Sequence, residues 1–486
     1  MRNTAAQLLP MDLRDFVCVT FLVVATLTAC LPLLTKYPAP GDDEPGFVDA
    51  AVNLTTRGVL GTPAYQGLLA GAEHHIYWQP PLYFVGLAGW FTVFGIGLVQ
   101  ARSLSLLCAV TIVILMYAIA RRHAPTFPSL SAAALLAVSY WLTNRASVAR
   151  MDAMCVALTL TSVLLYQYAQ DRSSLKLFGL SGLVAGLAFV THPLGIVAVA
   201  TQGIHLVVSE RRLVLSARKT HVVLACFTVA VVAWLGYILQ DPESFRLQMS
   251  AQLARKLQLR PYWYQFWIAK SHAITLVVVL GAAVWLSVVS LRKDATSLIA
   301  IAFGCSFAAA TYGRETGYFF YFYPWACCAL AIVLGRLSRH RLAVHTAVML
   351  AFANELAVLG HDNYRYLHRD YGALTRAVRD VVPPGKTVFI GPAEVSPYFA
   401  LLGRNPMRVA VPTSTPDPEA HRRTAEACDF IAVTVPLAYL QDVLAFIDEA
   451  SAVAVIDQGI GYRLAIYKSP AARTTFVECD STPTLR

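Results

Sequence analysis

Three consecutive carboxylates stand near the start of the chain, in the segment GDDE at 41–44. They follow an apolar run (16–34) after a few residues, and they precede an amphipathic stretch that starts at Phe47. Most acidic runs are solvated loops. A carboxylate held beside an apolar layer can instead act as a general base that takes the proton of a hydroxyl group. The position of the run makes Asp43 and Glu44 candidates for acid–base chemistry.

A further carboxylate, Asp152, follows Arg150 by two residues at the start of another apolar run, 152–170. As an exposed ion pair the two side chains would contribute little to stability. A carboxylate at the edge of a hydrocarbon layer, however, is costly unless it is paired or functional. Asp152 is therefore the third candidate, with Arg150 as its nearest partner.

Isolated cations between the apolar runs could bind a phosphate group. The alternative is that they anchor the chain to anionic lipid headgroups. They are Arg150, Arg255, Lys256, Arg260, Lys270 and Arg314, with His192 as a further titratable group.

Metal and disulfide sites have weaker support. Glu73, His74 and His75 are consecutive, but neighbouring histidines rarely bind one ion together, so we expect no metal. Most of the cysteines lie inside apolar runs, where they serve as small apolar side chains. Cys428 and Cys479 lie in a polar region and could pair if that region faces an oxidising compartment.

The amino-acid composition indicates that the apolar layer beside these residues is a lipid membrane. Of 486 residues, 57% are hydrophobic and 14% are charged, against about 25% charged residues in soluble domains. This excludes a soluble enzyme, a secreted disulfide scaffold and a disordered chain, and it predicts a polytopic helical membrane protein. The net charge of +10 resides largely in short clusters between apolar runs, so we expect no nucleic-acid partner.

We predict about eleven transmembrane helices by length and apolar character. They are 16–34, 101–120, 127–144, 152–170, 177–191, 193–208, 220–240, 273–291, 296–312, 317–335 and 342–360. The first is expected to be a retained signal anchor. Segment 80–97 is short and begins with two prolines, so we expect it to lie in the outer interface.

With this topology, basic clusters at 121–122, 172–176, 211–219, 292–293 and 336–341 share one side with the N-terminus. Positively charged loops stay in the cytoplasm. Loop 36–99, segment 241–271 and everything after 361 are therefore expected outside, in a multi-pass plasma membrane such as the bacterial inner membrane.

The chain should divide into a membrane domain, 1–360, and an extracytoplasmic domain, 361–486. Short apolar segments predict strands in the second domain, and helical patterns at 417–428 and 437–449 alternate with them, which is typical of a small α/β domain. The expected strands are 386–391, 407–412, 429–435, 452–457 and 462–467. No glycine-rich nucleotide fingerprint accompanies them, so we expect the domain to dock or to position an acceptor.

Several motifs occur in a fixed order along the first 340 residues. They are Asp43-Glu44, a helix ending in Arg57-Gly58, Tyr77-Trp78-Gln79-Pro80-Pro81-Leu82-Tyr83, Phe94-Gly95, Ala101-Arg102-Ser103-Leu104-Ser105, Ala149-Arg150-Met151-Asp152, Thr191-His192-Pro193-Leu194-Gly195, and Arg314 through Tyr321 to Pro324. This order resembles the GT-C glycosyltransferases of the protein O-mannosyltransferase and lipid A aminoarabinose-transferase type.

The resemblance implies an inverting transfer of a sugar from a polyprenyl-phosphate donor to a hydroxyl acceptor on the outer face. It implies that Asp43 is the base and that Glu44 and Asp152 support or orient the acceptor. By the same resemblance, the donor phosphate would meet Arg150, Lys270, Arg314 and Arg260, and the acceptor or sugar would meet Tyr77, Gln79, His192 and Tyr321. Relatives often carry Lys where this chain has Gln79, so the phosphate must find a cation elsewhere.

A transporter or flippase of lipid-linked sugars is the alternative function. A transporter should place ionisable residues near the middle of the membrane. Here the carboxylates gather in outer loops, and Asn354 and Glu355 are the main polar residues within a predicted span. The pattern favours the enzyme. The sugar, the acceptor and the prenyl chain length are not encoded in any motif that we recognise.

Overall fold

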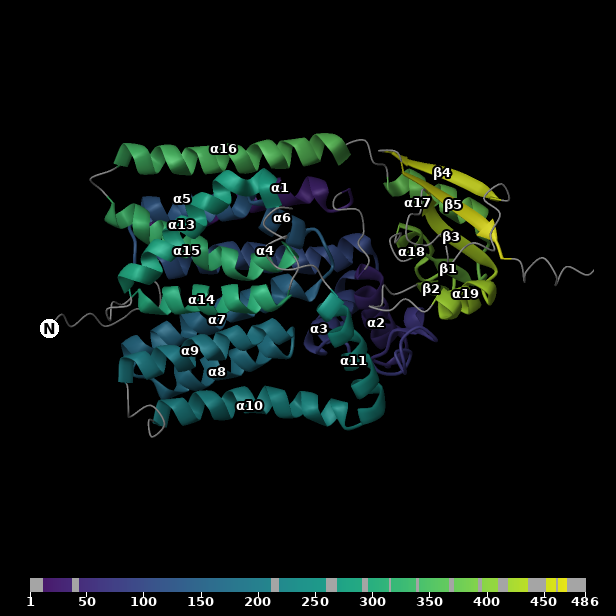
Figure 1. The fold of residues 1–486 in the computed structure, drawn as a ribbon, viewed down its shortest axis with the longest axis horizontal. Coiled ribbons are helices and arrows are strands. Elements are labelled where there is room, and N and C mark those ends of the chain that lie inside the picture. The colour runs from purple at the N-terminus through teal and green to yellow at the C-terminus, as the bar shows by residue number, and fades with distance from the viewer. Residues whose placement is uncertain are drawn as a thin grey trace, which may run out of the picture.

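A computed structural model describes residues 12–36, 43–210, 218–258, 269–290, 296–313, 316–337, 341–366, 371–391, 396–409, 418–435, 452–459 and 462–469. Long helices lie side by side in one bundle, and a small sheet covers one end of it (Figure 1). The bundle helices are α1 (Leu13–Cys30), α4 (Leu98–Arg121), α5 (Thr126–Val138), α6 (Tyr140–Ala146), α7 (Met151–Arg172), α8 (Leu175–Phe189), α9 (Ile196–Glu210), α10 (Arg218–Ile238), α13 (Ala273–Ser290), α14 (Ser297–Gly313), α15 (Phe319–Arg336) and α16 (Arg341–Tyr366).

The protein is a polytopic helical membrane protein. Within the described ranges, 6 helices are long and apolar enough to cross a membrane, or up to 7 if α5 and α6, which meet at 54°, form one bent span. The other predicted spans are also helical. Helices α8, α9 and α14 have only 15, 15 and 17 residues, whereas about 20 residues are needed to cross 30 Å of hydrocarbon at right angles. The number eleven therefore stays a prediction.

Shorter helices form part of the segments that we predict to lie outside the membrane. Helix α3 (Leu82–Phe94) has 13 residues, about 20 Å at 1.5 Å per residue, which is too short for a span. This agrees with a helix at the interface, although its orientation in the membrane stays a prediction. Together with α2 (Glu44–Arg57) and α11 (Pro242–Gln258), it lies at the end of the bundle that carries the sheet (Figure 1).

The polar residues inside α16 hold helices together. The Glu355 side chain is fully buried. Its carboxylate contacts Nδ1 of His272 at 3.2 Å and accepts the N–H of Tyr140 at 2.9 Å. This N–H belongs to the break between α5 and α6, where it has no helical partner. Asn354 donates to the carbonyl of Ser271 at 2.8 Å. Both residues thus join α16 to neighbouring segments, which gives them a role in packing.

All five predicted strands are present in the C-terminal domain. They form one mixed sheet in the order β2-β1-β3-β5-β4, with β1 parallel to β2 and β3 and with β5 antiparallel to β3 and β4. Their bounds are β1 (Val388–Ile390), β2 (Met407–Val409), β3 (Phe430–Val435), β4 (Ala454–Gly459) and β5 (Tyr462–Lys468), and the domain also contains α17 (Tyr371–Val381), α18 (Ser396–Leu401) and α19 (Pro418–Glu426).

The edges of the predicted domains differ from the structure in detail. Helix α16 continues to Tyr366, past the predicted boundary at 360. Helix α19 corresponds to the predicted helix 417–428, whereas the predicted helix 437–449 lies outside the described residues. Cys428 is buried, and its predicted partner, Cys479, also lies outside the described residues.

The C-terminal domain and the first outer loop share one apolar core. Phe47 and Tyr83 from the loop belong to the same buried cluster as Val388 and Tyr398 from the domain. Burial of apolar surface contributes roughly 25 cal/mol per Å². This shared cluster fixes the domain against α2, the helix that begins at the candidate base.

Candidate active site

Helix α2 presents the acidic motif at its N-terminus. Asp43 is the N-cap residue, Glu44 is the first helical residue and Pro45 occupies the first turn. Proline suits this position because the first turn has no use for its missing N–H. Negative charge is also favourable there, since the free N–H groups and the helix dipole attract it. The sequence therefore places a carboxylate pair at a helix start that faces the bundle.

Arg150 joins two of the three candidate carboxylates. Its Nη1 donates to Oδ2 of Asp43, and its Nε donates to Oδ2 of Asp152 at 2.8 Å. Arg150 is the extended N-cap residue of α7, and Asp152 lies in the first turn of that helix. The guanidinium carbon also lies 5.6 Å from the centre of the Phe47 ring. Residues more than one hundred positions apart thus meet in one acid–arginine–acid cluster.

Glu44 points away from this cluster. Its carboxylate receives two hydrogen bonds from Arg102, at 2.9 Å and 2.7 Å, and a third from the N–H of Ala149 at 2.7 Å. Both charged side chains are fully buried. Arg102 also donates to the carbonyl of Leu34 at 3.0 Å. The pair ties together the ends of α1, α2, α4 and α7, so Glu44 is placed to hold α2 in position.

Tyr321 and His192 stand beside Asp152. The Tyr321 hydroxyl donates to Oδ1 of Asp152 at 2.9 Å. The ring of His192 lies 5.5 Å from the Tyr321 ring, and its Nδ1 accepts the N–H of Leu194 at 3.1 Å. Burial lowers the pKa of His192 to about 4, so the ring is neutral at physiological pH. With Nδ1 as an acceptor, the proton resides on Nε2.

Two cations reach this region from distant elements: Lys256, which the sequence named as a phosphate candidate, and Arg145, which it did not single out. Lys256, on α11, donates to the hydroxyl of Tyr318 at 2.9 Å and lies 4.6 Å from the centre of that ring. Arg145, on α6, acts electrostatically on both Asp152 and His192.

The guanidinium of Arg145 rests against Gly317. A Cβ atom built on this glycine would lie 1.5 Å from Nη2 of Arg145. Only a residue without a side chain leaves room for the guanidinium in this position. Gly317 belongs to η6 (Thr316–Tyr318), the short turn that leads into α15.

The cations that were predicted to bind the donor phosphate do not gather at one place among the described residues. Arg150 already contacts two carboxylates, and Lys270 lies exposed on η5 (Ala269–His272). Arg260 and Arg314 lie outside the described residues.

Three buried polar atoms in the motif at 77–83 lack a hydrogen-bond partner among the described residues. They are Nε1 of Trp78, Oε1 of Gln79 and the hydroxyl of Tyr83. Trp78 stacks on Phe47 with ring centres 5.0 Å apart, and Phe47 in turn contacts Arg150. Unsatisfied buried groups are rare in folded proteins, and here that of Trp78 lies one ring contact away from Arg150.

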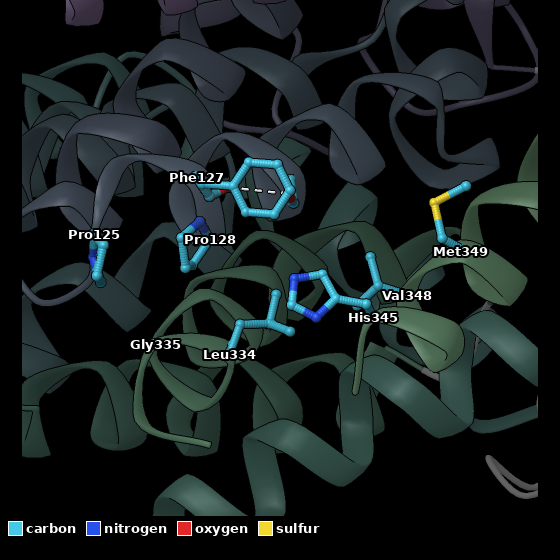
Figure 2. A pocket seen from close by; sticks show the side chains of 9 residues that line it. Pro125, Phe127, Pro128, Leu334, Gly335, His345, Val348 and Met349 are labelled. Atoms are coloured by element: carbon cyan, nitrogen blue, oxygen red, sulfur yellow. Dashed lines mark hydrogen bonds between the residues drawn. The ribbon is translucent and has the colours of Figure 1, made fainter. Parts of the chain in front are cut away.

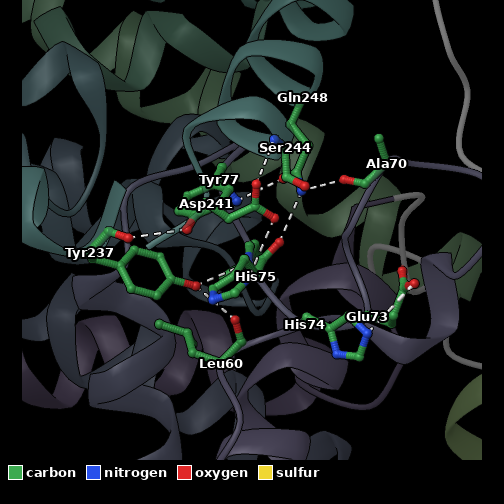
Figure 3. A network of polar contacts seen from close by, with 11 residues as sticks. Leu60, Ala70, Glu73, His74, His75, Tyr77, Tyr237, Asp241, Ser244 and Gln248 are labelled. Carbon is green, nitrogen blue, oxygen red and sulfur yellow. Dashed lines mark hydrogen bonds and ion pairs between the residues drawn. The ribbon is translucent and has the colours of Figure 1, made fainter. Parts of the chain in front are cut away.

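A buried glutamine fixes α11 to the first outer loop (Figure 3). Gln248 accepts the N–H groups of Tyr77 and Trp78 at 2.7 Å and 3.1 Å, and it donates to the carbonyls of Ala70 and His75 at 2.8 Å and 2.9 Å. The contact holds Lys256, two turns further along α11, against the bundle.

Tyr77 and the two histidines belong to this anchoring network. The Tyr77 hydroxyl donates to the carbonyl of Tyr237 at 3.1 Å. His75 stacks on Tyr77 and lies 3.9 Å from Asp241, whereas His74 points to solvent beside Glu73 (Figure 3). No group of three or more potential metal ligands gathers in the part of the chain that the structure describes. Tyr77 thus contacts α10 and α11, and its role in a sugar pocket stays a prediction.

A separate pocket of about 330 Å³, seen from close by in Figure 2, lies where α15 ends and α16 begins, at the end of the bundle away from the sheet. It is lined by Phe127 and Pro128 from α5, Leu334 from α15, and His345 and Met349 from α16. Arg121, at the end of α4 that is remote from Arg102, donates to the carbonyl of Ala124 beside this pocket. Its apolar lining and its distance from Asp43 separate it from the acid–arginine–acid cluster.

Sequence reasoning named Lys256 as a candidate for binding phosphate, but it missed Arg145 and gave no role to Arg102. One signal was available for Arg102, because a charge inside a predicted span must be paired or functional. For Arg145 there was no such signal, because its neighbours in sequence are not its neighbours in space.

The comparisons with known proteins agree with the geometry. Residues 78–237 match the family described as dolichyl-phosphate-mannose-protein mannosyltransferase. No curated protein matches the chain in sequence.

Solved structures share the fold. ArnT from Cupriavidus metallidurans in the apo state is similar with a TM-score of 0.67 and 13% identity, over 95% of this chain and 99% of that one. The same protein bound to undecaprenyl phosphate gives 0.64 and 14% over 95% and 99%. The archaeal oligosaccharyltransferase AglB from Archaeoglobus fulgidus, in complex with an inhibitory peptide and a dolichol-phosphate, gives 0.59 and 11% over 88% and 70%.

The helical bundle and the sheet-bearing domain of this chain thus occur together in a known fold. The chain therefore has the fold of ArnT over 95% of its length, and its residues 78–237 are similar to the family described as dolichyl-phosphate-mannose-protein mannosyltransferase.

Proposed function

We propose that the protein transfers a sugar from a polyprenyl-phosphate donor to a hydroxyl acceptor on the extracytoplasmic face. The observation that carries the proposal is the cluster in which Arg150 joins Asp43 to Asp152. A relative of the same fold is bound to undecaprenyl phosphate, which supports a lipid-linked donor. Nucleotide sugars are not available outside the cell, so a site on that face needs a donor that the membrane delivers.

In the proposed reaction Asp43 is the general base. The acceptor O–H bond breaks and its proton passes to Asp43, while the acceptor oxygen forms a bond to the anomeric carbon. The bond between that carbon and the phosphate oxygen breaks, and its electron pair leaves with the polyprenyl phosphate. A single displacement of this kind inverts the anomeric centre. Arg150 fixes the orientation of Asp43. Asp152 fixes Arg150, and the Tyr321 hydroxyl in turn fixes Asp152.

The experiment that tests the function follows both halves of the reaction. Purified protein in proteoliposomes receives a polyprenyl-phosphate sugar with a radiolabelled sugar, together with an envelope extract as the source of acceptor. We expect label in the acceptor fraction and equimolar release of polyprenyl phosphate. Movement of intact labelled lipid across the bilayer without release of polyprenyl phosphate would contradict the proposal and support the transporter.

Lys256 and Arg145 are proposed to stabilise the leaving phosphate in the place of the Lys that Gln79 replaces. We expect Lys256→Met to raise the KM for the donor roughly ten-fold to a hundred-fold, because a hydrogen bond to a charged group contributes about 1.5–3 kcal/mol. Steady-state kinetics with the labelled donor measure this. Arg145→Gln should act in the same direction.

The control lies on the same helix. Arg246 on α11 forms an exposed pair with Glu243, so Arg246→Gln should leave the KM for the donor unchanged. A normal KM in both Lys256→Met and Arg145→Gln would refute this assignment of the phosphate site.

The orientation of the chain can be tested separately. With the N-terminus in the cytoplasm, a reporter fused after Pro125 should report a cytoplasmic position, because α3 does not span in the proposed topology. Paired alkaline phosphatase and fluorescent-protein fusions measure this. High phosphatase activity at this position would mean that α3 spans or that the whole chain is inverted.

A further inference from the structure

A pocket of about 470 Å³ lies between α2 and the segment that joins α18 to β2. Helix α2 contributes side chains that recur at helical spacing and therefore share one face. They are Asp49, Val52, Asn53, Thr56 and Arg57. The opposite wall, residues 402–408, belongs to the C-terminal domain. Neither part of the molecule forms this pocket alone.

Positive charge dominates the pocket. Its lining includes the guanidinium groups of Arg57, Arg404 and Arg408 and one carboxyl group, that of Asp49. None of the lining residues is aromatic. Arginine forks suit phosphate and carboxylate groups, which they bind through two parallel hydrogen bonds. The lining thus favours an anionic ligand.

The walls are held by contacts between the two parts. Arg408 donates to Oε1 of Gln66 at 2.7 Å. Asp49 accepts the N–H of Ala64 at 2.8 Å and the hydroxyl of Tyr398 at 3.3 Å. These bonds, together with the shared apolar core, fix the shape of the pocket before a ligand arrives, which reduces the cost of binding.

A buried acceptor atom in the wall lacks a partner. Asn405 lines the pocket and is 7% exposed. Its Nδ2 donates to the carbonyls of Pro383 and Lys386 at 2.6 Å and 3.1 Å, whereas its Oδ1 has no hydrogen-bond partner among the described residues. This oxygen is buried within the wall, so the amide of Asn405 holds the wall together. The ligand should carry an oxyanion for the three arginines, and as an acceptor it also carries a hydroxyl group.

We propose that this pocket binds an anionic sugar of the acceptor, one that bears a phosphate or a carboxylate. The inference rests on the proposed function and gives the C-terminal domain a role in it. Asp49 follows Asp43 by six residues on α2, about 9 Å along the helix axis. An acceptor molecule that lies along α2 can place its charged sugar in the pocket, while a hydroxyl group on another part of the same molecule reaches Asp43.

Binding to the purified protein tests the proposal without any donor. Calorimetry with glucose 6-phosphate should show saturable binding, with glucose much weaker because the oxyanion is missing. Inorganic phosphate should also bind more weakly than glucose 6-phosphate if the hydroxyls contribute. Arg404→Gln and Arg57→Gln should each weaken binding of glucose 6-phosphate about ten-fold, the effect of losing one charged hydrogen bond.

A matched control comes from the same domain. Arg422 is exposed on α19, pairs with Glu426 and does not line the pocket. Arg422→Gln should bind glucose 6-phosphate as the parent protein does. No saturable binding, or equal binding by the Arg404→Gln, Arg57→Gln and Arg422→Gln variants, would overturn the proposal.

Protonation of Asp49 should make anion binding in this pocket depend on pH. Burial raises the pKa of Asp49 to about 6, against the opposing effect of Arg408 and Arg57 and of the Ala64 N–H and Tyr398 hydroxyl. Below pH 6 the carboxyl is neutral, so the pocket loses its negative charge while Arg404 and the other guanidinium groups stay positive. Glucuronate, whose own charge is constant from pH 7.5 to 5, should therefore bind more tightly at pH 5.

Asp49→Asn should remove most of this pH dependence. A parent protein that binds glucuronate equally at both pH values would contradict the assignment of Asp49. Binding by Asp43→Asn separates the two proposals, since this variant should bind glucose 6-phosphate normally even though it transfers sugar much more slowly. If Asp43→Asn is fully active but the pocket variants still lose binding, the proposed base fails and the pocket stands.

Discussion

Replacing Asp43 by Asn should lower kcat for sugar transfer by about 10²–10⁴, the usual contribution of a general base. The amide keeps the size of the side chain and its place at the start of α2, but it cannot accept the proton of the acceptor hydroxyl. The initial rate of radiolabel transfer from a polyprenyl-phosphate sugar, measured at saturating donor, gives kcat directly. The KM for the donor should change little, because Asp43 is proposed to act on the acceptor.

The control for this variant is Glu73→Gln. Glu73 lies in the same outer loop and contacts only the solvent-exposed His74 in the network of Figure 3, so its loss should leave kcat unchanged. Size-exclusion profiles and melting temperatures should match for both variants and the parent. A fully active, normally folded Asp43→Asn protein would refute Asp43 as the base.

Breaking the Glu44–Arg102 pair should produce the largest loss of stability. Glu44→Gln leaves a guanidinium that is fully buried without its counter-charge, and an uncompensated buried charge costs about 3–5 kcal/mol. We expect a lower melting temperature and a lower yield in detergent. The double variant Glu44→Gln/Arg102→Met should recover much of the loss, because it removes the unpaired charge as well.

An exposed pair provides the comparison. Arg246 and Glu243 are each 65% exposed on α11, and solvent screens such pairs, so Arg246→Gln should not shift the melting temperature measurably. If Glu44→Gln is as stable as the parent, the buried pair does not hold α2 in place. The double variant also separates stability from chemistry, since a stable but inactive double variant would point to a direct role of Glu44 in transfer.

Much of the local structure followed from the sequence. The low charge predicted the membrane bundle, and each predicted span is helical in the structure. All five strands of the C-terminal sheet were predicted within a few residues. These features depend on hydrophobic period and run length, which are properties of contiguous residues. The spans were harder to count, because α8, α9 and α14 are apolar but shorter than the bilayer core requires.

The roles of individual charged side chains were harder to predict from the sequence. Asp43 and Glu44 are neighbours in the chain, yet one contacts Arg150 and the other contacts Arg102. Successive residues at a helix start point in directions about 100° apart, so adjacency in sequence does not imply a shared function. The sequence alone could not tell the proposed base from the carboxylate that holds its helix in place.

The sequence by itself determined that this is a helical membrane protein, where its helices and strands lie, and the order of the motifs that contain Asp43, Arg150 and Asp152. Only the tertiary structure decided which charges meet. Lys256 and Arg145 approach from α11 and α6, and the pocket lined by Asp49 and Arg404 forms from two distant parts of the chain. The physical reason is that hydrophobic patterns act over a few turns of chain, whereas ion pairs and pockets depend on packing between segments hundreds of residues apart.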